Sequence, residues 1–214
     1  MNKQEFRQLR KDGFRNVPIT REIIADLDTP LSCYIKLARG PYSYLLESAA
    51  QGGEKWSRYS IVGLPATKII KISGQTISTF VSGDLVDSFS HPDPLQYIEE
   101  VLDSIKYPNV EDMPIYTGGL VGYFGYDTVR YVENNLRETV PKDILGVPDI
   151  QLMYSNELVV FDNVKGRMHL VTHADPFEEG SFEQAQLLSL IHISEPTRLL
   201  SIECCGVCVK KKKG

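Results

Sequence analysis

The chain has 214 residues, a formal net charge of −5, and ordinary shares of hydrophobic (42%) and charged (24%) residues. This composition is typical of a soluble globular protein with one domain or two small ones. The negative charge argues against nucleic acid as the main partner, and no apolar run approaches the length of a membrane span. The first residues are polar and lead into no apolar segment, so we expect no secretory signal and a cytoplasmic location.

Two short helices are predicted near the N-terminus. Asn2 followed by Glu5 fits a capping box, and Gly13 can end the helix that follows. Thr29 before Pro30 predicts the start of a second helix, because proline is well suited to the first helical position. The apolar positions expected to define that second helix are Leu31, Ile35 and Ala38.

The most specific stretch of the sequence lies between residues 42 and 63. A short apolar strand ends in Glu47 and Ser48, and Arg58 precedes a second strand over residues 59–62. An acid and an alcohol at a strand end, with an arginine on the next element, could hold a small zwitterion. Glu47 would face the ammonium group and Arg58 the carboxylate. The alternative is a buried strand whose end residues only cap a loop.

Residues 68–72 and 76–81 flank Ser73-Gly74-Gln75, a pattern that predicts a β-hairpin. Asp93 before Pro94 predicts the start of a helix with one buried stripe. Together with the strands on either side, these elements predict an α/β fold of the α+β type, with antiparallel β-sheets and flanking helices. The apolar positions of the predicted stripe are Leu95, Ile98, Leu102 and Ile105.

A glycine-rich run follows over residues 118–127, with glycines at every third position from Gly119. This spacing is not the dinucleotide fingerprint, and the lysine of a phosphate-binding loop is missing. We therefore interpret the run as a central strand whose glycines let a neighbouring backbone approach closely, followed by a helical turn over residues 127–133. Residues 152–161 and 168–172 predict a second hairpin, and Ser181 opens a further helix.

Catalytic chemistry is not evident in these residues. His169 and His173 fall on one face of a predicted strand without a third ligand, so we interpret them as a surface pair and predict no metal site. We find no nucleophile elbow and no paired-carboxylate motif, and predict no catalytic residue in this chain. Of the four cysteines, Cys33 stands alone, and the others cluster near the C-terminus at Cys204, Cys205 and Cys208.

Taken in order, several segments resemble the N-terminal part of component I of anthranilate synthase, a chorismate-utilising family. Because many segments agree in order, the resemblance is more specific than any one of them, and it extends from Met1 to about Gln186. It favours the tryptophan branch over the related aminodeoxychorismate synthases. The matching segments are residues 28–32, 44–48, 52–56, 58–65, 118–127, 129–133 and 159–163.

The resemblance implies a partial component I fold and a share in converting chorismate and ammonia to anthranilate and pyruvate. It implies Mg²⁺ as cofactor in the complete enzyme and a glutamine amidotransferase subunit (component II) as partner. It also implies feedback inhibition by L-tryptophan, with Ser48 matching the tryptophan-contacting serine, Glu47 its neighbour, and Arg58 a basic position. An ammonium partner, a carboxylate partner and an apolar slot are what tryptophan requires.

The resemblance stops after Gln186, and the family's chorismate-binding and magnesium-binding residues belong to a part that is not matched. Residues 188–198 resemble one translated frame of a common sequencing adapter. We therefore interpret residues 1–186 as the component I region and residues 187–214 as a non-native, disordered tail. The alternative is a real tail that binds a metal or an anionic surface through its cysteines and the lysines at 210–213.

Three functional hypotheses remain. The first is the regulatory and scaffold part of anthranilate synthase component I, inactive by itself. The second is a non-catalytic amino-acid-binding module. The third is a fragment of aminodeoxychorismate synthase component I. Tryptophan inhibition with anthranilate as product separates the first from the third.

Overall fold

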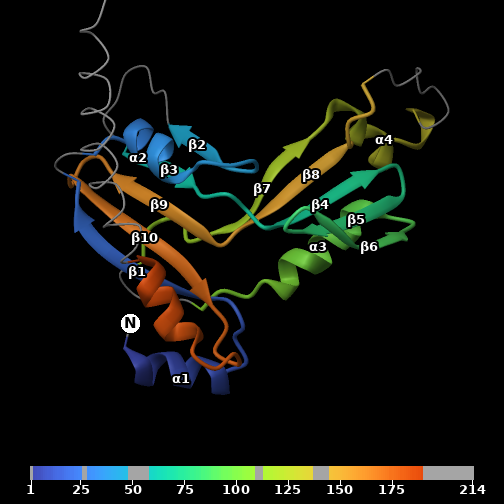
Figure 1. The fold of residues 1–214 in the computed structure, drawn as a ribbon. Coiled ribbons are helices and arrows are strands. Elements are labelled where there is room, and N and C mark those ends of the chain that lie inside the picture. Colours follow the sequence, from blue (N-terminus) through green and yellow to red (C-terminus); the bar gives the residue numbers. More distant parts are fainter. Residues whose placement is uncertain (1, 26–27, 48–57, 109–112, 137–144, 190–214) are drawn as a thin grey trace, which may run out of the picture. The chain divides into compact units, whose positions relative to one another are not determined.

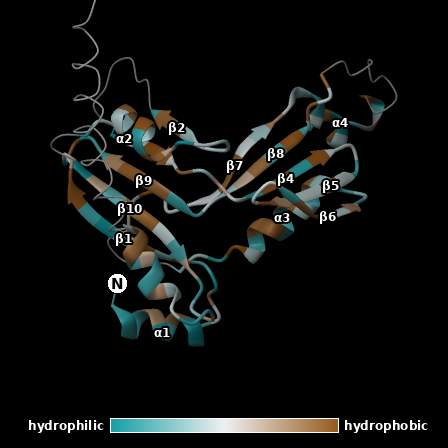
Figure 2. Cartoon of the chain, viewed as in Figure 1, coloured by the Kyte–Doolittle hydropathy of each residue, from teal (hydrophilic) through white to brown (hydrophobic). Residues whose placement is uncertain are grey.

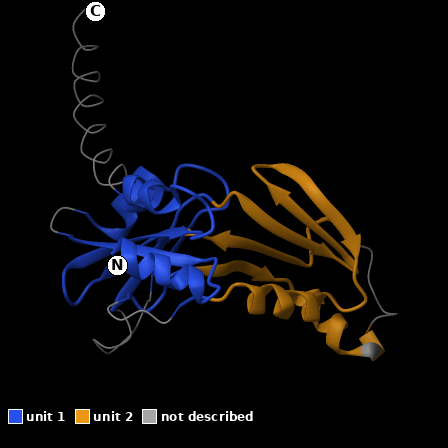
Figure 3. Cartoon of the chain, turned by 90° about the horizontal axis from the view of Figure 1, so that it is seen from below, with its two compact units in different colours: residues 1–65, 107–117, 157–214 blue, residues 66–106, 118–156 orange. Residues whose placement is uncertain are grey.

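The computed structural model describes residues 2–25, 28–47, 58–108, 113–136 and 145–189 (Figure 1). The chain divides into two compact units (Figure 3). Unit 1 takes residues 1–65, 107–117 and 157–214, and unit 2 takes residues 66–106 and 118–156. Each unit holds one five-stranded antiparallel sheet, so the predicted α+β class with flanking helices is confirmed.

The sheet of unit 1 has the strand order β1-β10-β9-β3-β2. Its central strand β9 is buried along nearly its whole length and carries hydrophobic residues, as Figure 2 shows. A central strand that is buried on both faces of the sheet has a continuous apolar sequence. The strands are β1 (Val17–Ile24), β2 (Tyr44–Glu47), β3 (Tyr59–Gly63), β9 (Glu157–Asp162) and β10 (Arg167–Ala174).

Helix α1 (Lys3–Lys11) begins with the predicted capping box, since the Asn2 side chain accepts from backbone N–H groups and Glu5 bonds back to Asn2. Gly13 follows the helix with φ +82, which confirms its predicted role at the helix end. Phe6 is the buried residue of this mostly hydrophilic helix (Figure 2). It packs in a cluster of unit 1 with Val17, Ile19, Ala174, Phe182 and Ala185.

Helix α2 (Pro30–Leu37) starts where the sequence predicts, with Thr29 as N-cap and Pro30 in the first turn. The apolar positions chosen from sequence are only partly buried, because Leu31 is 55% exposed and Ile35 is 60% exposed. Cys33 faces the sheet instead and joins a buried cluster with Ala38. This helix has apolar residues on both sides, and contact with β2 and β3 decides which side is covered.

Unit 2 contains the sheet β6-β5-β4-β8-β7, with α3 (Pro94–Ser104) against it. The predicted hairpin is β4–β5, and Gly74 has φ +56 in its turn. Asp93 caps α3 as predicted, but Val101 is buried where Leu102 was expected, and Leu102 is exposed. The strands are β4 (Lys68–Ser73), β5 (Thr76–Val81), β6 (Asp84–Ser90), β7 (Gly119–Phe124) and β8 (Ile150–Ser155).

The glycine-rich run forms β7, which is an edge strand of the described sheet and not the predicted central one. The predicted close approach is confirmed, because a Cβ on Gly122 would lie 1.9 Å from the backbone oxygen of Gln151. The predicted helical turn is also present after β7. It consists of the 3-10 turn Tyr126–Thr128, helix α4 (Val129–Val132) and the 3-10 turn Asn134–Leu136.

The predicted strand over residues 152–161 is two strands, which is a correction. It breaks at Asn156 into β8, which belongs to unit 2, and β9, which belongs to unit 1. The hairpin of β9 with β10 is confirmed, with Gly166 at φ +63 in its turn. Both strands are apolar and contiguous, so hydrophobicity alone did not separate them.

Ser181 opens a helix over residues 181–189, as predicted, and this helix continues past the expected boundary at Gln186. Residues 190–214, with their cysteines and lysines, lie outside the described residues, so the prediction of a disordered tail stays a prediction. Among the residues that the structure describes, no helix is long and apolar enough to cross a membrane.

Candidate functional site

Of the three residues predicted to bind an amino acid, the structure describes two. Ser48 lies outside the described residues. Glu47 is the last residue of β2, is exposed, and pairs in register with Ser60 of β3. Arg58 immediately precedes β3. The predicted strand that ends in a carboxylate is therefore confirmed, together with the second strand beside it.

The guanidinium group of Arg58 bonds to a carboxylate of its own chain, that of Asp162 at the end of β9. Nε lies 3.1 Å from Oδ1 and 3.1 Å from Oδ2, and Nη2 lies 2.6 Å from Oδ2. Asp162 is 3% exposed, whereas the Arg58 side chain is 36% exposed and its Cζ lies 4.9 Å from the centre of the Tyr59 ring. This planar fork-to-carboxylate arrangement is the strong form of an ion pair.

Asp162 also organises the turn between β9 and β10. Its Oδ1 accepts from the backbone N–H of Val164 at 3.2 Å and of Lys165 at 3.1 Å. The hydrogen bond from Arg58 holds the pKa of this carboxyl below its usual value, against the effect of burial, and the turn amides add to the lowering. The same bond raises the pKa of Arg58. Sequence reasoning missed Asp162, although an acid between an apolar strand and an Asn-Val-Lys-Gly turn was a signal for it.

Glu47 and the guanidinium of Arg58 belong to opposite faces of the sheet. Residues directly opposite in an antiparallel pair share a face, and consecutive residues alternate. Glu47 is opposite Ser60, and Asp162 is opposite Tyr59, so the two acids project to different sides. The guanidinium of Arg58 lies on the same side as Asp162, because it is hydrogen-bonded to that carboxylate. The structure therefore does not bring the predicted acid and base together on one face.

A second set of bonds joins the same strand ends through Asn163. The backbone N–H of Asn163 donates to the carbonyl oxygen of Arg58 at 2.8 Å, and its side-chain Nδ2 donates to Ser60 Oγ at 3.1 Å. Ser60 is buried and stands directly opposite Glu47. The end of β3 is thus fixed on one side by the β9–β10 turn and on the other by β2.

The two histidines of β10 share a face, as predicted, but both are half-buried, so the predicted surface pair is wrong. His169 Nδ1 lies 4.0 Å from a Glu22 oxygen, and burial lowers the pKa of His169. His173 stacks against Tyr107, with ring centroids 5.2 Å apart. Among the described residues, no group of three or more His, Cys, Asp or Glu side chains could hold a metal ion.

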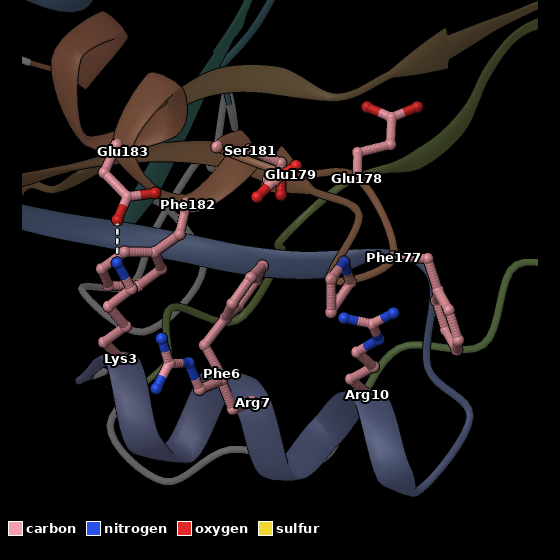
Figure 4. A pocket seen from close by; sticks show the side chains of 12 residues that line it. Lys3, Phe6, Arg7, Arg10, Phe177, Glu178, Glu179, Ser181, Phe182 and Glu183 are labelled. Atoms are coloured by element: carbon pink, nitrogen blue, oxygen red, sulfur yellow. Dashed lines mark hydrogen bonds and ion pairs between the residues drawn. The ribbon is translucent and has the colours of Figure 1, made fainter.

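A pocket of about 580 Å³ lies in unit 1 between α1 and residues 176–183 (Figure 4). The pocket is lined by basic residues of α1 (Lys3, Arg7 and Arg10) and by acidic residues of the other segment (Glu178, Glu179 and Glu183). Lys3 forms an ion pair with Glu183, and Arg10 lies over the Phe177 ring at 5.2 Å. The Lys3–Glu183 pair is exposed on both sides and contributes little stability, and the pocket shares no residue with the strand end of Glu47 and Arg58.

The described chain is thus a mixed α/β protein with two antiparallel sheets, and the polar strand end of unit 1 contains the internal ion pair of Arg58 with Asp162. No protein-family model matches it. It is 50% identical over 186 residues to "Anthranilate synthase component 1" of Pseudomonas putida, 48% identical over 186 residues to that of Pseudomonas aeruginosa, and 44% identical over 189 residues to that of Neisseria meningitidis. Each match covers 87% of this chain and 38% of the relative.

The chain therefore belongs to the anthranilate synthase component 1 family, and it spans about 38% of the length of the curated relatives that it matches. Among solved structures, anthranilate synthase component I from Streptococcus pneumoniae matches with a TM-score of 0.47 and 25% identity, over 79% of this chain and 36% of that one.

Proposed function

We propose that this chain is the regulatory and scaffold part of an anthranilate synthase. The complete enzyme would convert chorismate and ammonia to anthranilate and pyruvate, the first step of tryptophan biosynthesis, with ammonia from a glutamine amidotransferase subunit. The observation that carries this proposal is the 50% identity to a curated component 1 over 186 residues. The family implies a cytoplasmic enzyme, and the net charge of −5 supports a protein without a nucleic-acid partner.

The family also implies Mg²⁺ in the complete enzyme. Mg²⁺ takes its protein ligands mainly from carboxylates, and the described residues contain no group of three or more potential ligands. We propose that the Mg²⁺ ligands belong to the portion of the relatives that this chain does not span. We expect the groups that act on chorismate in the portion of the relatives that this chain does not span.

We further propose that L-tryptophan binds at the end of β2 as a feedback inhibitor, at a site of Ser48, Glu47 and Arg58. The exposed carboxylate of Glu47 can take the ammonium group of the effector. Ser48 would donate or accept a hydrogen bond, and Arg58 would shape the polar end. Inhibition follows if tryptophan binds the inactive state more tightly than the active state.

Replacing Ser48 by alanine in the full-length enzyme tests this site. A hydrogen bond to a charged group is worth about 1.5–3 kcal/mol, so the tryptophan concentration for half-inhibition should rise roughly ten- to a hundred-fold. Ser43→Ala is the matched control, because the Ser43 hydroxyl donates to the carbonyl oxygen of Ala38 at 3.2 Å near the other end of β2. It should lower the melting temperature and leave inhibition unchanged. Unchanged inhibition in Ser48→Ala would refute the site.

The isolated 214-residue chain should show no anthranilate synthase activity with glutamine or ammonia, because binding an effector gives no rate acceleration by itself. Anthranilate fluorescence above background from the purified chain would contradict this. For the full-length enzyme, anthranilate as product and inhibition by tryptophan are expected. Aminodeoxychorismate as product would identify the aminodeoxychorismate synthase alternative, and no turnover of chorismate would favour a non-catalytic amino-acid-binding module.

A further inference from the structure

The ion pair of Arg58 with Asp162 joins segments that are 104 residues apart in the sequence. Arg58 precedes β3, and Asp162 ends β9 and caps the turn into β10. Asp162 is buried and uses both of its oxygens on Arg58, while one of them also accepts from two turn amides. A buried carboxylate with this many donors is held in one orientation, and so is the arginine that it binds.

We propose that Asp162 is a positioning residue of the proposed L-tryptophan site. It fixes the side chain of Arg58 and, through Arg58, helps to hold the end of β3 beside Glu47. This inference rests on the proposed function. Arg58 then acts as a structural support and not as the partner of the effector's carboxylate. The carboxylate that occupies its guanidinium is that of Asp162.

The face of the sheet on which each group lies supports this assignment. The guanidinium of Arg58 lies with Asp162 and over the ring of Tyr59. Glu47 projects from the other face, opposite Ser60. A single amino acid held by Glu47 through its ammonium group would have to reach through the sheet to place its carboxylate on this guanidinium.

The support reaches Glu47 through described bonds. Arg58 accepts from the backbone N–H of Asn163, and Asn163 Nδ2 donates to Ser60 Oγ. Ser60 is the register partner of Glu47. Removing the Arg58–Asp162 pair takes away one of the two sets of bonds at the end of β3 and leaves the Asn163 bonds, so the strand end beside Glu47 is held less firmly. Small-ligand sites depend on such fixed positions.

The first test measures inhibition of the full-length enzyme by L-tryptophan in Arg58→Ala, Asp162→Asn and the double variant, each relative to its own uninhibited rate. Asp162→Asn keeps an oxygen for the turn amides and removes the charge. We expect the half-inhibiting concentration to rise about tenfold in each single variant and no further in the double variant, because both act through one pair. Glu22→Gln, which removes an exposed ion pair with Arg167 in the same sheet, is the control and should leave inhibition unchanged.

The second test compares L-tryptophan with L-tryptophan amide, which lacks the carboxylate charge. If Arg58 is a support, the ratio of their half-inhibiting concentrations is the same in Arg58→Ala as in the wild type. If Arg58 binds the effector's carboxylate, this ratio collapses in Arg58→Ala, and the inference is overturned. An unchanged response to tryptophan in Asp162→Asn, with a wild type that is inhibited, overturns it as well.

The third test needs no effector and separates this inference from the proposed function. Amide hydrogen exchange of residues 45–47 and 59–61 in the full-length enzyme should be about tenfold faster in Asp162→Asn, and β1 should be unchanged. Equal exchange in both proteins overturns the inference. A wild type that tryptophan does not inhibit would instead refute the proposed function, and the exchange result would still decide whether Asp162 positions this strand end.

Discussion

Each unit has an aspartate that joins distant segments at a strand end, and the two use different partners. In unit 1, Asp162 binds the guanidinium of Arg58 and two turn amides. In unit 2, Asp149 precedes β8 and accepts from the hydroxyl of Tyr131 at 2.8 Å and from the N–H of Gly74 at 2.7 Å. Its own carbonyl oxygen accepts from the N–H of Gly125 at 2.7 Å.

The difference is one of charge. Asp162 faces a cation, and the pKa of Asp162 is held below its usual value mainly by that hydrogen bond. Asp149 has neutral donors, and the neighbouring strands of its sheet approach so closely that Gly122 has no room for a Cβ. The carboxylate at the strand end of unit 1 is therefore held by a cation, whereas the one in unit 2 is held by uncharged donors, beside strands that fit closely.

The largest effect is expected from Gly122→Ala in unit 2. The new Cβ would lie 1.9 Å from the Gln151 oxygen, a backbone atom of the paired strand, so β7 and β8 must separate. We expect a loss of about 3 kcal/mol in the free energy of unfolding, measured by urea denaturation. Gly63→Ala in unit 1 is the control, because its Cβ would meet the movable ring of Tyr44 at the same 1.9 Å. Equal losses in the two variants would contradict the steric account.

A smaller effect, and a pH-dependent one, is expected from Asp162→Asn. The folded pKa of Asp162 lies below its ordinary value of 3.8, so this carboxylate stabilises the fold fully above that value and loses its contribution as pH falls through the folded pKa. The wild type should be more stable than the variant at neutral pH, and the difference should shrink in denaturation at about pH 3. A difference that is the same at both pH values would show that the charge is not what matters.

Tyr131→Phe should have a modest effect without pH dependence. It removes the hydroxyl that donates to the carboxylate of Asp149, which costs about 1.5–3 kcal/mol of unfolding free energy. Burial, and then the bond with Asp149, raises the pKa of Tyr131, so stability is present below the unfolded pKa and is lost only as pH rises above it. The loss should therefore be the same between about pH 5 and 8. If the loss of stability in Tyr131→Phe varied with pH over this range, the two strand ends would not differ in their pH dependence.

The smallest effect is expected from Glu22→Gln. Its ion pair with Arg167 in unit 1 is exposed on both sides, and exposed pairs are worth about 0.5 kcal/mol or less. The change in melting temperature should lie within the error of a careful measurement. It should vanish in 1 M salt, because the Debye length is then only about 3 Å and the two charges are screened from each other. A large loss would show that exposed pairs in this sheet matter as much as the buried carboxylate of Asp162.

Local signals in the sequence were sufficient where one residue decides one backbone conformation. The capping box of Asn2 and Glu5, the helix start at Thr29 and Pro30, and the turn at Gly74 were all predicted correctly. Each of these conformations depends on hydrogen bonds or dihedral angles within a few residues, so the neighbouring sequence is enough to predict it. The strand that ends at Glu47 was predicted for the same reason, from its apolar run and its polar end.

Only the tertiary structure decided which apolar side of α2 is covered, where the run 152–161 breaks, and which partner Arg58 takes. These outcomes depend on segments far apart in the chain. Arg58 and Asp162 are 104 residues apart, and nothing near either residue distinguishes a ligand's carboxylate from an internal one. The sequence by itself determined the family, the antiparallel elements and the position of the polar strand end. The fold then paired the arginine with Asp162, because sheet register places that buried acid beside it.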